Sequence, residues 1–147
     1  DRPFTVAAAR ELVAGVKALN PGSMLVTTSR RTPAEVVELL QRELPKPCYF
    51  YRFGDAGDNP YFGLLAWADE IVVTGDSMSM CSECCAAGVP VFLFAPDEMM
   101  SVKHKRFHQT LYREGYAMPL GAVAKQPAGT LNPAFEIAEK IREKLQD

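Results

Sequence analysis

Residues 74–83 hold the side chains whose types and spacing point most directly to chemistry. An apolar run, Ile71-Val72-Val73, leads into the sequence Thr-Gly-Asp-Ser-Met-Ser, and a helical pattern starts directly after it. Free backbone N–H groups and hydroxyls at such a helix start bind phosphate, helped by the helix dipole. The candidate phosphate-binding residues are therefore Thr74, Gly75, Asp76, Ser77, Met78 and Ser79.

Glu83 lies about one turn into the same predicted helix. From there its carboxylate could accept hydrogen bonds from two neighbouring hydroxyls, as on a ribose. The competing interpretation is structural: Ser77 or Ser79 caps the helix, and Glu83 gains only from the helix dipole. The spacing by itself favours neither interpretation.

A second candidate is the sequence Ser29-Arg30-Arg31, which follows the first predicted strand. Two adjacent guanidinium groups can clamp a diphosphate in bidentate fashion. The competing interpretation is that both arginines are solvated and merely precede a helix. Because ligands of parallel sheets bind at the carboxyl ends of the strands, we expect at least one of these arginines to contact a ligand.

A basic run at residues 103–106 begins a further predicted helix, with His108 one turn on. A solvated basic face is the commonest role of such a run, and a phosphate or acceptor contact from Lys103 or His104 is the alternative. His104 and His108 share a helix face, as metal ligands would, but no third ligand is evident. We therefore expect no metal site.

The cysteines Cys81, Cys84 and Cys85 include a C-x-x-C at a helix start, which is a spacing found in redox and zinc sites. No second cysteine pair exists, and small apolar side chains pack well in a helix against a sheet. We expect these cysteines to serve packing. The same is expected of Tyr61 and Trp67 on a short helix.

The pattern of apolar residues alternates between helix and strand along the chain. Residues 32–35 (Thr-Pro-Ala-Glu) predict a helix start with Thr32 as N-cap, and Gly115 is typical of the residue after a helix. Helices are predicted over residues 5–19, 32–44, 60–68, 79–87, 102–114 and 133–145, and strands over residues 23–28, 48–53, 70–74 and 89–94.

These strands are short and almost continuously apolar, as a parallel sheet covered on both faces requires. The predicted fold class is a three-layer α/β, Rossmann-like parallel sheet, and 147 residues suit one domain. The carboxyl edge of that sheet is predicted to hold residues 27–31, 53–59, 74–80 and 95–104.

Composition excludes several classes of function. A formal net charge of −2 argues against nucleic-acid binding and against a polybasic membrane anchor. The longest run without charge, residues 84–96, is too short to span a bilayer. Four cysteines without a disulfide pattern indicate a reducing compartment, so a cytoplasmic location is expected, with peripheral membrane attachment left open. A start at Asp1 suggests a part of something longer.

Four enzyme signatures are missing from the sequence. These are the dinucleotide fingerprint G-x-G-x-x-G, the phosphate loop G-x-x-x-x-G-K-[ST], the nucleophile elbow G-x-S-x-G and the pair Tyr-x-x-x-Lys. The last of these absences argues against an epimerase of the short-chain dehydrogenase type.

Several blocks of the sequence resemble the mitochondrial-fission, "elongated mitochondria" family and its bacterial relatives. The resemblance extends from about residue 23 to residue 145. It implies a glycosyltransferase-like protein, and an older description of some members is nucleoside-diphosphate-sugar epimerase. The blocks are residues 28–33 (TSRRTP), 59–63 (NPYFG), 66–69 (AWAD), 73–83 (VTGDSMSMCSE), 87–91 (AGVPV) and Phe107-His108-x-x-Leu111.

More widely, residues 68–90 are similar to the donor-binding, C-terminal half of GT-B glycosyltransferases. That likeness implies a nucleotide diphosphate sugar as ligand, held by the loop and by Glu83, and no separate cofactor. It also implies a missing N-terminal domain with the acceptor site, so that this chain alone is expected to be inactive. Glycine-rich loops are usual at the phosphate position, and Asp76 departs from them, since its charge would repel phosphate unless it faces away, binds a cation or receives a sugar hydroxyl.

Two functions from different classes remain open at this point. The first is the nucleotide-sugar-binding half of a GT-B-like glycosyltransferase. The second is a non-catalytic interaction module of the mitochondrial-fission type. The sequence identifies neither the sugar, the acceptor nor a catalytic base.

Overall fold

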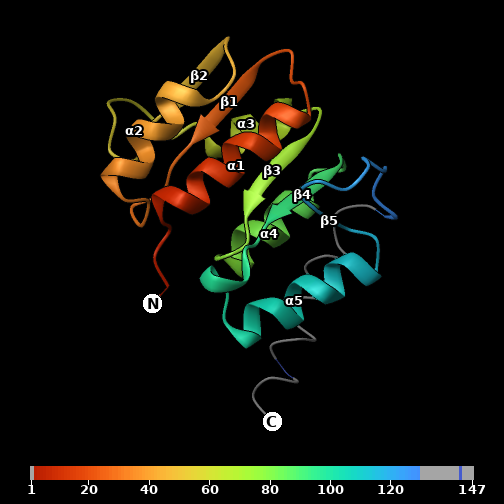
Figure 1. The fold of residues 1–147 in the computed structure, drawn as a ribbon. Helices are drawn as coiled ribbons and strands as arrows, with labels where there is room; N and C mark the ends of the chain where they lie inside the picture. The colour runs from red at the N-terminus through yellow and green to blue at the C-terminus, as the bar shows by residue number, and fades with distance from the viewer. Residues whose placement is uncertain (1, 130–142, 144–147) are drawn as a thin grey trace. The chain divides into compact units, whose positions relative to one another are not determined.

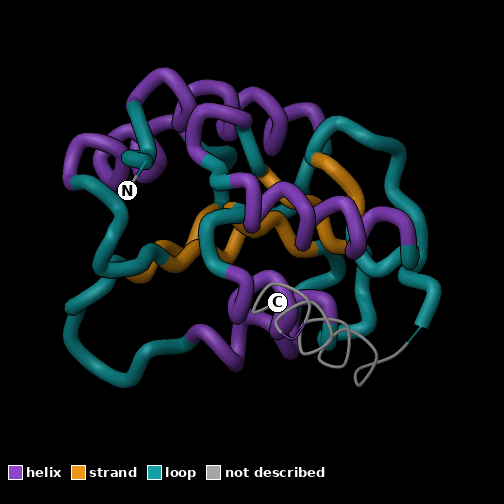
Figure 2. The backbone as a smooth tube through the Cα atoms, turned by 90° about the horizontal axis from the view of Figure 1, so that it is seen from below, coloured by secondary structure: helices purple, strands orange, loops and turns teal. Residues whose placement is uncertain are grey.

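The computed structural model describes residues 2–129 and 143, and the chain divides into two compact units, Asp1–Trp67 and Ala68–Asp147. Both units combine α-helices with parallel β-strands, which confirms the predicted α/β class (Figure 1). The strands form two sheets, one in each unit. Figure 2 shows the regular alternation of helix, strand and loop along the backbone.

The first unit is built from α1 (Val6–Ala18), β1 (Met24–Thr27), α2 (Ala34–Glu43), β2 (Cys48–Tyr51) and α3 (Tyr61–Trp67). Strands β1 and β2 pair in parallel, with Met24 opposite Cys48 and Thr27 opposite Tyr51. Helices α1 and α2 pack on each other and bury their apolar faces. The buried residues of the two helices are Ala8, Ala9, Leu12, Val13 and Val16 of α1 with Val36, Leu39 and Leu40 of α2.

Local signals set the ends of these helices. Thr5 caps α1 by accepting the N–H of Ala8 at 3.1 Å. The prediction that Thr32 caps α2 is wrong, because Pro33 occupies the N-cap position in an extended conformation. The Thr32 hydroxyl instead accepts the backbone N–H of Ser29 at 3.2 Å and closes a turn before the helix. Helix α2 therefore starts without a side-chain cap.

The second unit contains β3 (Ile71–Thr74), α4 (Met78–Cys85), β4 (Val91–Phe94), the 3₁₀ turn η1 (Asp97–Met99), α5 (Val102–Arg113) and β5 (Met118–Pro119). Its strands are parallel in the order β3-β4-β5, and the central strand β4 is buried along its whole length. The sequence did not predict β5, since two residues with one proline carry no strand period. The helix predicted over residues 133–145 lies outside the described residues, apart from residue 143.

The expectation that Trp67 packs into the protein is wrong. Trp67 is 82% exposed, and α3 has no buried residue. Tyr61 is half-buried and meets Phe62 edge to face, with ring centroids 5.1 Å apart, but Phe62 itself is 72% exposed. Seven residues give a helix too short to bury a continuous apolar stripe.

Gly75 and His108 connect the end of β3 to α5. The backbone N–H of Gly75 donates to the carbonyl of Phe94 at 2.9 Å, and its carbonyl accepts the Nε2–H of the buried His108 at 2.8 Å. A Cβ at residue 75 would lie 2.5 Å from Cε1 and 2.7 Å from Nε2 of that imidazole. The glycine is therefore required by the histidine ring, which occupies the space of a side chain.

This contact predicts strong coupling between two substitutions. Gly75→Ala should lower the free energy of unfolding by about 1–3 kcal/mol, because the new methyl group overlaps the imidazole. In a His108→Ala background most of that cost should disappear, since the ring is gone and only Ala95 remains close, at 3.0 Å. Urea unfolding of the two single variants and the double variant measures the coupling, and strictly additive losses would contradict it.

The buried imidazole also predicts a pH dependence of stability. Burial lowers the pKa of His108, against the opposing effect of its hydrogen bond to Gly75, so the unfolded chain binds this proton more readily than the folded one. The stability contributed by His108 is therefore present above its unfolded pKa, about 6.5, and is lost as pH falls through the lowered folded pKa. Melting temperatures between pH 8 and pH 4.5 should fall less in His108→Gln, and parallel curves would refute the assignment.

Candidate functional site

A pocket of about 260 Å³ opens at the carboxyl ends of β1 and β2 in the first unit. This is the edge at which a parallel sheet places its ligands, because both strands end in loops there. The lining residues come from the β1–α2 loop, the start of α2 and the residues after β2. They are Thr28, Ser29, Arg30, Thr32, Ala34, Val37, Glu38, Arg52 and Phe53.

The β1–α2 wall is shaped by a turn between Ser29 and Thr32. The N–H of Thr32 donates to the Ser29 carbonyl at 3.1 Å, and the Ser29 N–H donates to the Thr32 hydroxyl at 3.2 Å. The Ser29 hydroxyl accepts the N–H of Arg31 at 3.2 Å. Of the two predicted arginines, Arg30 lines the pocket, whereas Arg31 is exposed and is not among the lining residues.

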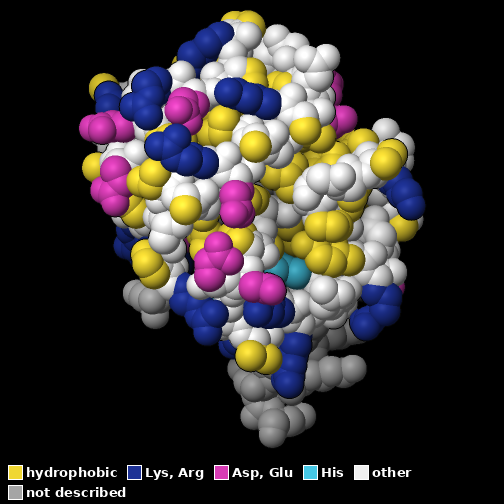
Figure 3. Space-filling view, viewed as in Figure 1, with side chains coloured by type: hydrophobic (Ala, Val, Ile, Leu, Met, Phe, Trp, Pro, Cys, Tyr) yellow, Lys and Arg dark blue, Asp and Glu magenta, His cyan; other side chains and the backbone are white. Residues whose placement is uncertain are grey.

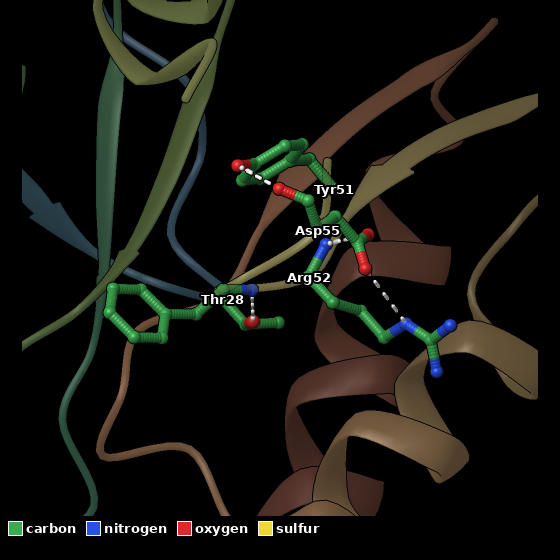
Figure 4. Close-up of polar contacts among 5 residues, drawn as sticks. Thr28, Tyr51, Arg52 and Asp55 are labelled. Atoms are coloured by element: carbon green, nitrogen blue, oxygen red, sulfur yellow. Dashed lines mark hydrogen bonds and ion pairs between the residues drawn. The ribbon is translucent and has the colours of Figure 1, made fainter. Parts of the chain in front are cut away.

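The β2 wall is supplied by Arg52 and Phe53. Figure 4 shows the contacts around them, in which the backbone N–H of Phe53 donates to the Thr28 hydroxyl at 2.9 Å. This bond joins the loop after β2 to the end of β1. The Phe53 ring is 57% exposed, although its backbone is fixed.

Sequence reasoning missed several members of this pocket, namely Thr28, Thr32, Arg52 and Phe53 as ligand-facing residues. A signal for two of them was present, because residues 27–31, which include Thr28, and residues 53–59, which include Phe53, were assigned to the carboxyl edge of the sheet. The predicted strand ended at residue 53, whereas β2 ends at Tyr51. That difference of two residues moves Arg52 from the strand into the loop.

The charges on the pocket wall suit an anion. Arg30 and Arg52 are both exposed cations, and Glu38 is the single carboxylate among the lining residues. Figure 3 shows that Lys and Arg side chains are interspersed with Asp and Glu on the face it presents, rather than forming one continuous basic surface. The pocket therefore offers local anion binding through two guanidinium groups and three hydroxyls, not the broad basic footprint that nucleic acid requires.

The predicted phosphate loop lies in the second unit, at the end of β3 and the start of α4. Ser77 is the N-cap of α4, and its hydroxyl accepts the N–H of Met80 at 3.3 Å, as the structural interpretation expected. Both polar backbone groups of Gly75 are already bonded within the protein. Thr74 ends β3, Asp76 and Met78 are half-buried, Ser79 is exposed, and Glu83 is half-buried on α4. A ligand role for this loop and for Glu83 stays a prediction.

His104 belongs to the start of α5. Its Nδ1 accepts the N–H of Ser101 at 3.2 Å, and its own N–H donates to the Ser101 hydroxyl at 3.2 Å, which forms a capping box. Its ring stacks over His108 at a centroid distance of 6.4 Å, so the predicted shared face is confirmed. Lys103 beside it is exposed. Within the described part of the chain, no group of three His, Cys, Asp or Glu side chains could hold a metal ion.

The cysteines of α4 pack inside the second unit. Cys81, Cys84 and Cys85 are buried, and the Cys81 thiol donates to the Thr74 carbonyl at 3.8 Å. Burial raises the pKa of Cys81 and raises the pKa of Cys85 to about 12. Because the thiolate is the reactive and metal-binding form, these thiols suit packing, as expected.

None of the helices in the described residues has the length and apolar content needed to cross a bilayer. No solved structure matches this sequence. The sequence does match one family model and two curated proteins.

The family model described as mitochondrial fission ELM1 matches residues 1–145. The mitochondrial fission protein ELM1 of Arabidopsis thaliana is 34% identical over 128 residues, which are 84% of this chain and 30% of that protein. An uncharacterized protein of Rickettsia prowazekii (strain Madrid E) is 32% identical over 123 residues, which are 80% of this chain and 35% of that protein. The chain thus spans about a third of the length of these relatives, and it belongs to the mitochondrial fission ELM1 family.

Proposed function

We propose that this chain binds the nucleoside diphosphate of a nucleotide sugar, as the donor-binding part of a glycosyltransferase-like protein of the mitochondrial fission family. The observation that supports this most is the placing of Arg30 and Arg52 on one pocket from two different strand ends. Guanidinium groups recognise phosphate oxygens through paired N–H donors, and two of them match the two phosphates of a diphosphate.

The start of α2 adds to this anion site. Helix α2 has no side-chain cap, since Pro33 stands at the N-cap and the Thr32 hydroxyl is bonded to Ser29. No side chain caps its first N–H groups, of which that of Val36 already donates to the Pro33 carbonyl at 3.0 Å. Ala34, the first residue of α2, lines the pocket. The helix dipole thus supports negative charge in the same place as the arginines.

The size of the pocket and its aromatic wall suit one end of a nucleotide. Small-molecule pockets usually measure about 300–1,000 Å³, so about 260 Å³ suits part of a nucleotide sugar rather than the whole ligand. Phe53 presents an exposed ring beside the cations, and such rings stack on nucleobases. We therefore assign Arg30 and Arg52 to the phosphates and Phe53 to the base.

The second unit has proposed roles of its own. As a separate, alternative site for the phosphates, the backbone N–H groups at the start of α4 and the exposed Ser79 are proposed contacts, with Glu83 as the proposed contact for ribose hydroxyls. Ser77 is the weaker candidate of the two serines, because its hydroxyl already accepts the N–H of Met80. Lys103 is exposed and is kept as a proposed phosphate contact.

The second candidate function is a non-catalytic interaction module in mitochondrial fission. The name of the Arabidopsis relative, mitochondrial fission protein ELM1, favours it, and so do the exposed aromatic side chains of α3, Phe62 and Trp67. An interaction module of this type would tolerate the loss of both pocket arginines, whereas a nucleotide-binding protein would not.

Loss of a pocket arginine should abolish most nucleotide binding. Arg30→Ala and Arg52→Ala should each cost about 1.5–3 kcal/mol of binding free energy, the usual range for hydrogen bonds to charged groups. Calorimetric titration with nucleoside diphosphates measures this, and the rise of the melting temperature with ligand gives an independent readout. Arg31→Ala is the matched control, since it removes the same charge from a residue outside the pocket lining. Equal losses in all three variants would point to charge in general and would contradict the assigned site.

Phe53 should distinguish a nucleotide from its phosphates. Phe53→Ala keeps the backbone N–H that bonds to Thr28 but removes the ring, so affinity for a nucleoside diphosphate should fall by about 1–3 kcal/mol. Affinity for inorganic pyrophosphate should stay unchanged, because pyrophosphate has no base. Phe62→Ala is the control, as it removes another exposed aromatic ring that does not line the pocket. A parallel loss of pyrophosphate binding in Phe53→Ala would show that the residue supports the fold of the site instead.

A further inference from the structure

The loop after β2 is organised around Asp55, whose carboxylate contacts Arg52 in two ways (Figure 4). Oδ2 accepts the backbone N–H of Arg52 at 2.8 Å, and Oδ1 lies 3.8 Å from the Nε of the Arg52 guanidinium. The backbone closes the same turn, since the Asp55 N–H donates to the Arg52 carbonyl at 2.9 Å. One carboxylate therefore holds both the main chain and the side chain of the pocket arginine.

Asp55 is itself held by the sheet. The hydroxyl of Tyr51, the buried last residue of β2, donates to the Asp55 carbonyl at 2.9 Å and lies 3.4 Å from the Gly57 carbonyl. Gly54 and Gly57 both have φ of +92°, a backbone conformation that favours glycine, so the chain can turn back within six residues. The position of the carboxylate is thus set by a strand residue and not by a flexible loop alone.

The contact at Nε has a consequence for binding. Arg52 has a long, half-exposed side chain with many rotamers, and binding a phosphate would have to order it. The Asp55 carboxylate, 3.8 Å from Nε, attracts the guanidinium to this edge of the turn and leaves its two terminal nitrogen atoms available. Bidentate contacts with phosphate use paired N–H groups of the guanidinium, so a guanidinium held at one edge is prepared for them.

Asp55 also has an effect that would lower the affinity for an anion. The Asp55 carboxylate is a negative charge beside the pocket, and it weakens the attraction of Arg52 for an anion. Water screens this repulsion, and it screens the Arg52–Asp55 ion pair in the same way. The backbone bond at 2.8 Å and the Tyr51 contact are not lost to screening, and they fix the turn from which the Arg52 side chain projects. The gain in affinity from positioning Arg52 should therefore exceed the loss caused by the negative charge of Asp55.

We propose that Asp55 is a positioning residue that presents the guanidinium of Arg52 to the phosphate groups of the ligand, an inference that rests on the function proposed above. It acts through Arg52 and needs no contact with the ligand. Its effect on affinity must consequently vanish once the guanidinium is removed.

Asp55→Asn is the sharpest test, with inorganic pyrophosphate and a nucleoside diphosphate as probes in calorimetric titration. Asparagine keeps an oxygen that can accept the Arg52 N–H but lacks the charge that holds Nε. We expect about 3- to 10-fold weaker binding with an unchanged melting temperature, as for the loss of preorganisation in one side chain. In an Arg52→Ala background the same substitution should change neither affinity, because a double-mutant cycle isolates the coupling.

Glu38→Gln is the matched control. Glu38 is the carboxylate that lines the pocket from α2, and its loss removes the same charge without touching the Arg52 turn. If charge alone mattered, both variants would bind more tightly. If Asp55 positions Arg52, the two substitutions should change the affinity differently: Asp55→Asn should bind more weakly, and Glu38→Gln should bind equally well or more tightly.

A second variant covers the case in which Asp55→Asn does not fold. Tyr51→Phe removes only the hydroxyl that holds the Asp55 carbonyl, and it should weaken binding in the same direction by a smaller factor. In the unliganded protein, nitrogen NMR of the Arg52 Nε–H should show a more ordered group than that of Arg30, and Tyr51→Phe should lower that order. An Nε–H as mobile as that of Arg30 would overturn the proposal.

The remaining outcomes separate the two proposals. If pyrophosphate binds and Arg52→Ala weakens it, but Asp55→Asn binds equally well or more tightly, only the positioning role fails. An equal loss from Asp55→Asn with and without Arg52 would also reject positioning, since the effect would then be structural. If the unaltered protein binds neither probe, or if Arg52→Ala binds normally, the proposed function fails and the role of Asp55 fails with it.

Discussion

The candidate pocket depends on one hydrogen bond, from the backbone N–H of Phe53 to the hydroxyl of Thr28, 2.9 Å long. Parallel pairing of β1 and β2 brings their carboxyl ends to the same edge, but it does not fix the loops that follow. The threonine hydroxyl supplies that constraint, because it joins the first residue after β1 to the second residue after β2. Residues on either side, Ser29 and Arg30 on one loop and Arg52 on the other, therefore line a single cavity.

Two of the strand–loop–helix transitions, β1–α2 and β3–α4, satisfy their polar groups differently. In the second unit, Ser77 caps α4. The Gly75 N–H donates to a carbonyl of β4 and the Gly75 carbonyl accepts from His108 of α5, so these groups of the loop have partners within the protein. In the first unit, Thr32 is used in a turn and α2 is left without a side-chain cap. An uncapped helix start retains donors for an external anion, whereas a capped one has fewer. The start of α2 therefore complements the two cations on the wall of the pocket.

The sequence was a good guide to the elements and a poorer guide to their ends. Apolar runs located β1, β2, β3 and β4, although only β4 is buried along its whole length. Helical spacing of apolar residues located α1, and capping chemistry identified the turn at Gly115, whose φ is +78°. It failed at α2, because a Thr-Pro pair can place either residue at the cap and only the competing turn with Ser29 decides between them.

For the site, sequence reasoning found Arg30 from its place after a strand and could not find Arg52. Arg52 enters the pocket only because β2 ends at Tyr51 and a turn with Asp55 follows, and strand ends are set by tertiary contacts that a single sequence does not record. The aromatic residue Trp67 shows the converse, since its size suggested burial and α3 leaves it exposed. Size predicts a place in the core only where a neighbouring surface exists to cover the ring.

The pocket has the parts of a binding site and few of those of a catalytic one. Sugar transfer needs a base or an equivalent group beside the acceptor, with both reactants held in a reactive geometry. Among the lining residues only Glu38 can accept a proton near neutral pH, and it is exposed on α2. The arrangement of cations, hydroxyls and an aromatic ring is instead suited to holding a phosphorylated ligand in place. Binding through these residues is thus compatible with a transferase whose acceptor side would come from elsewhere, whereas an interaction module that binds no nucleotide would have no need of the two arginines.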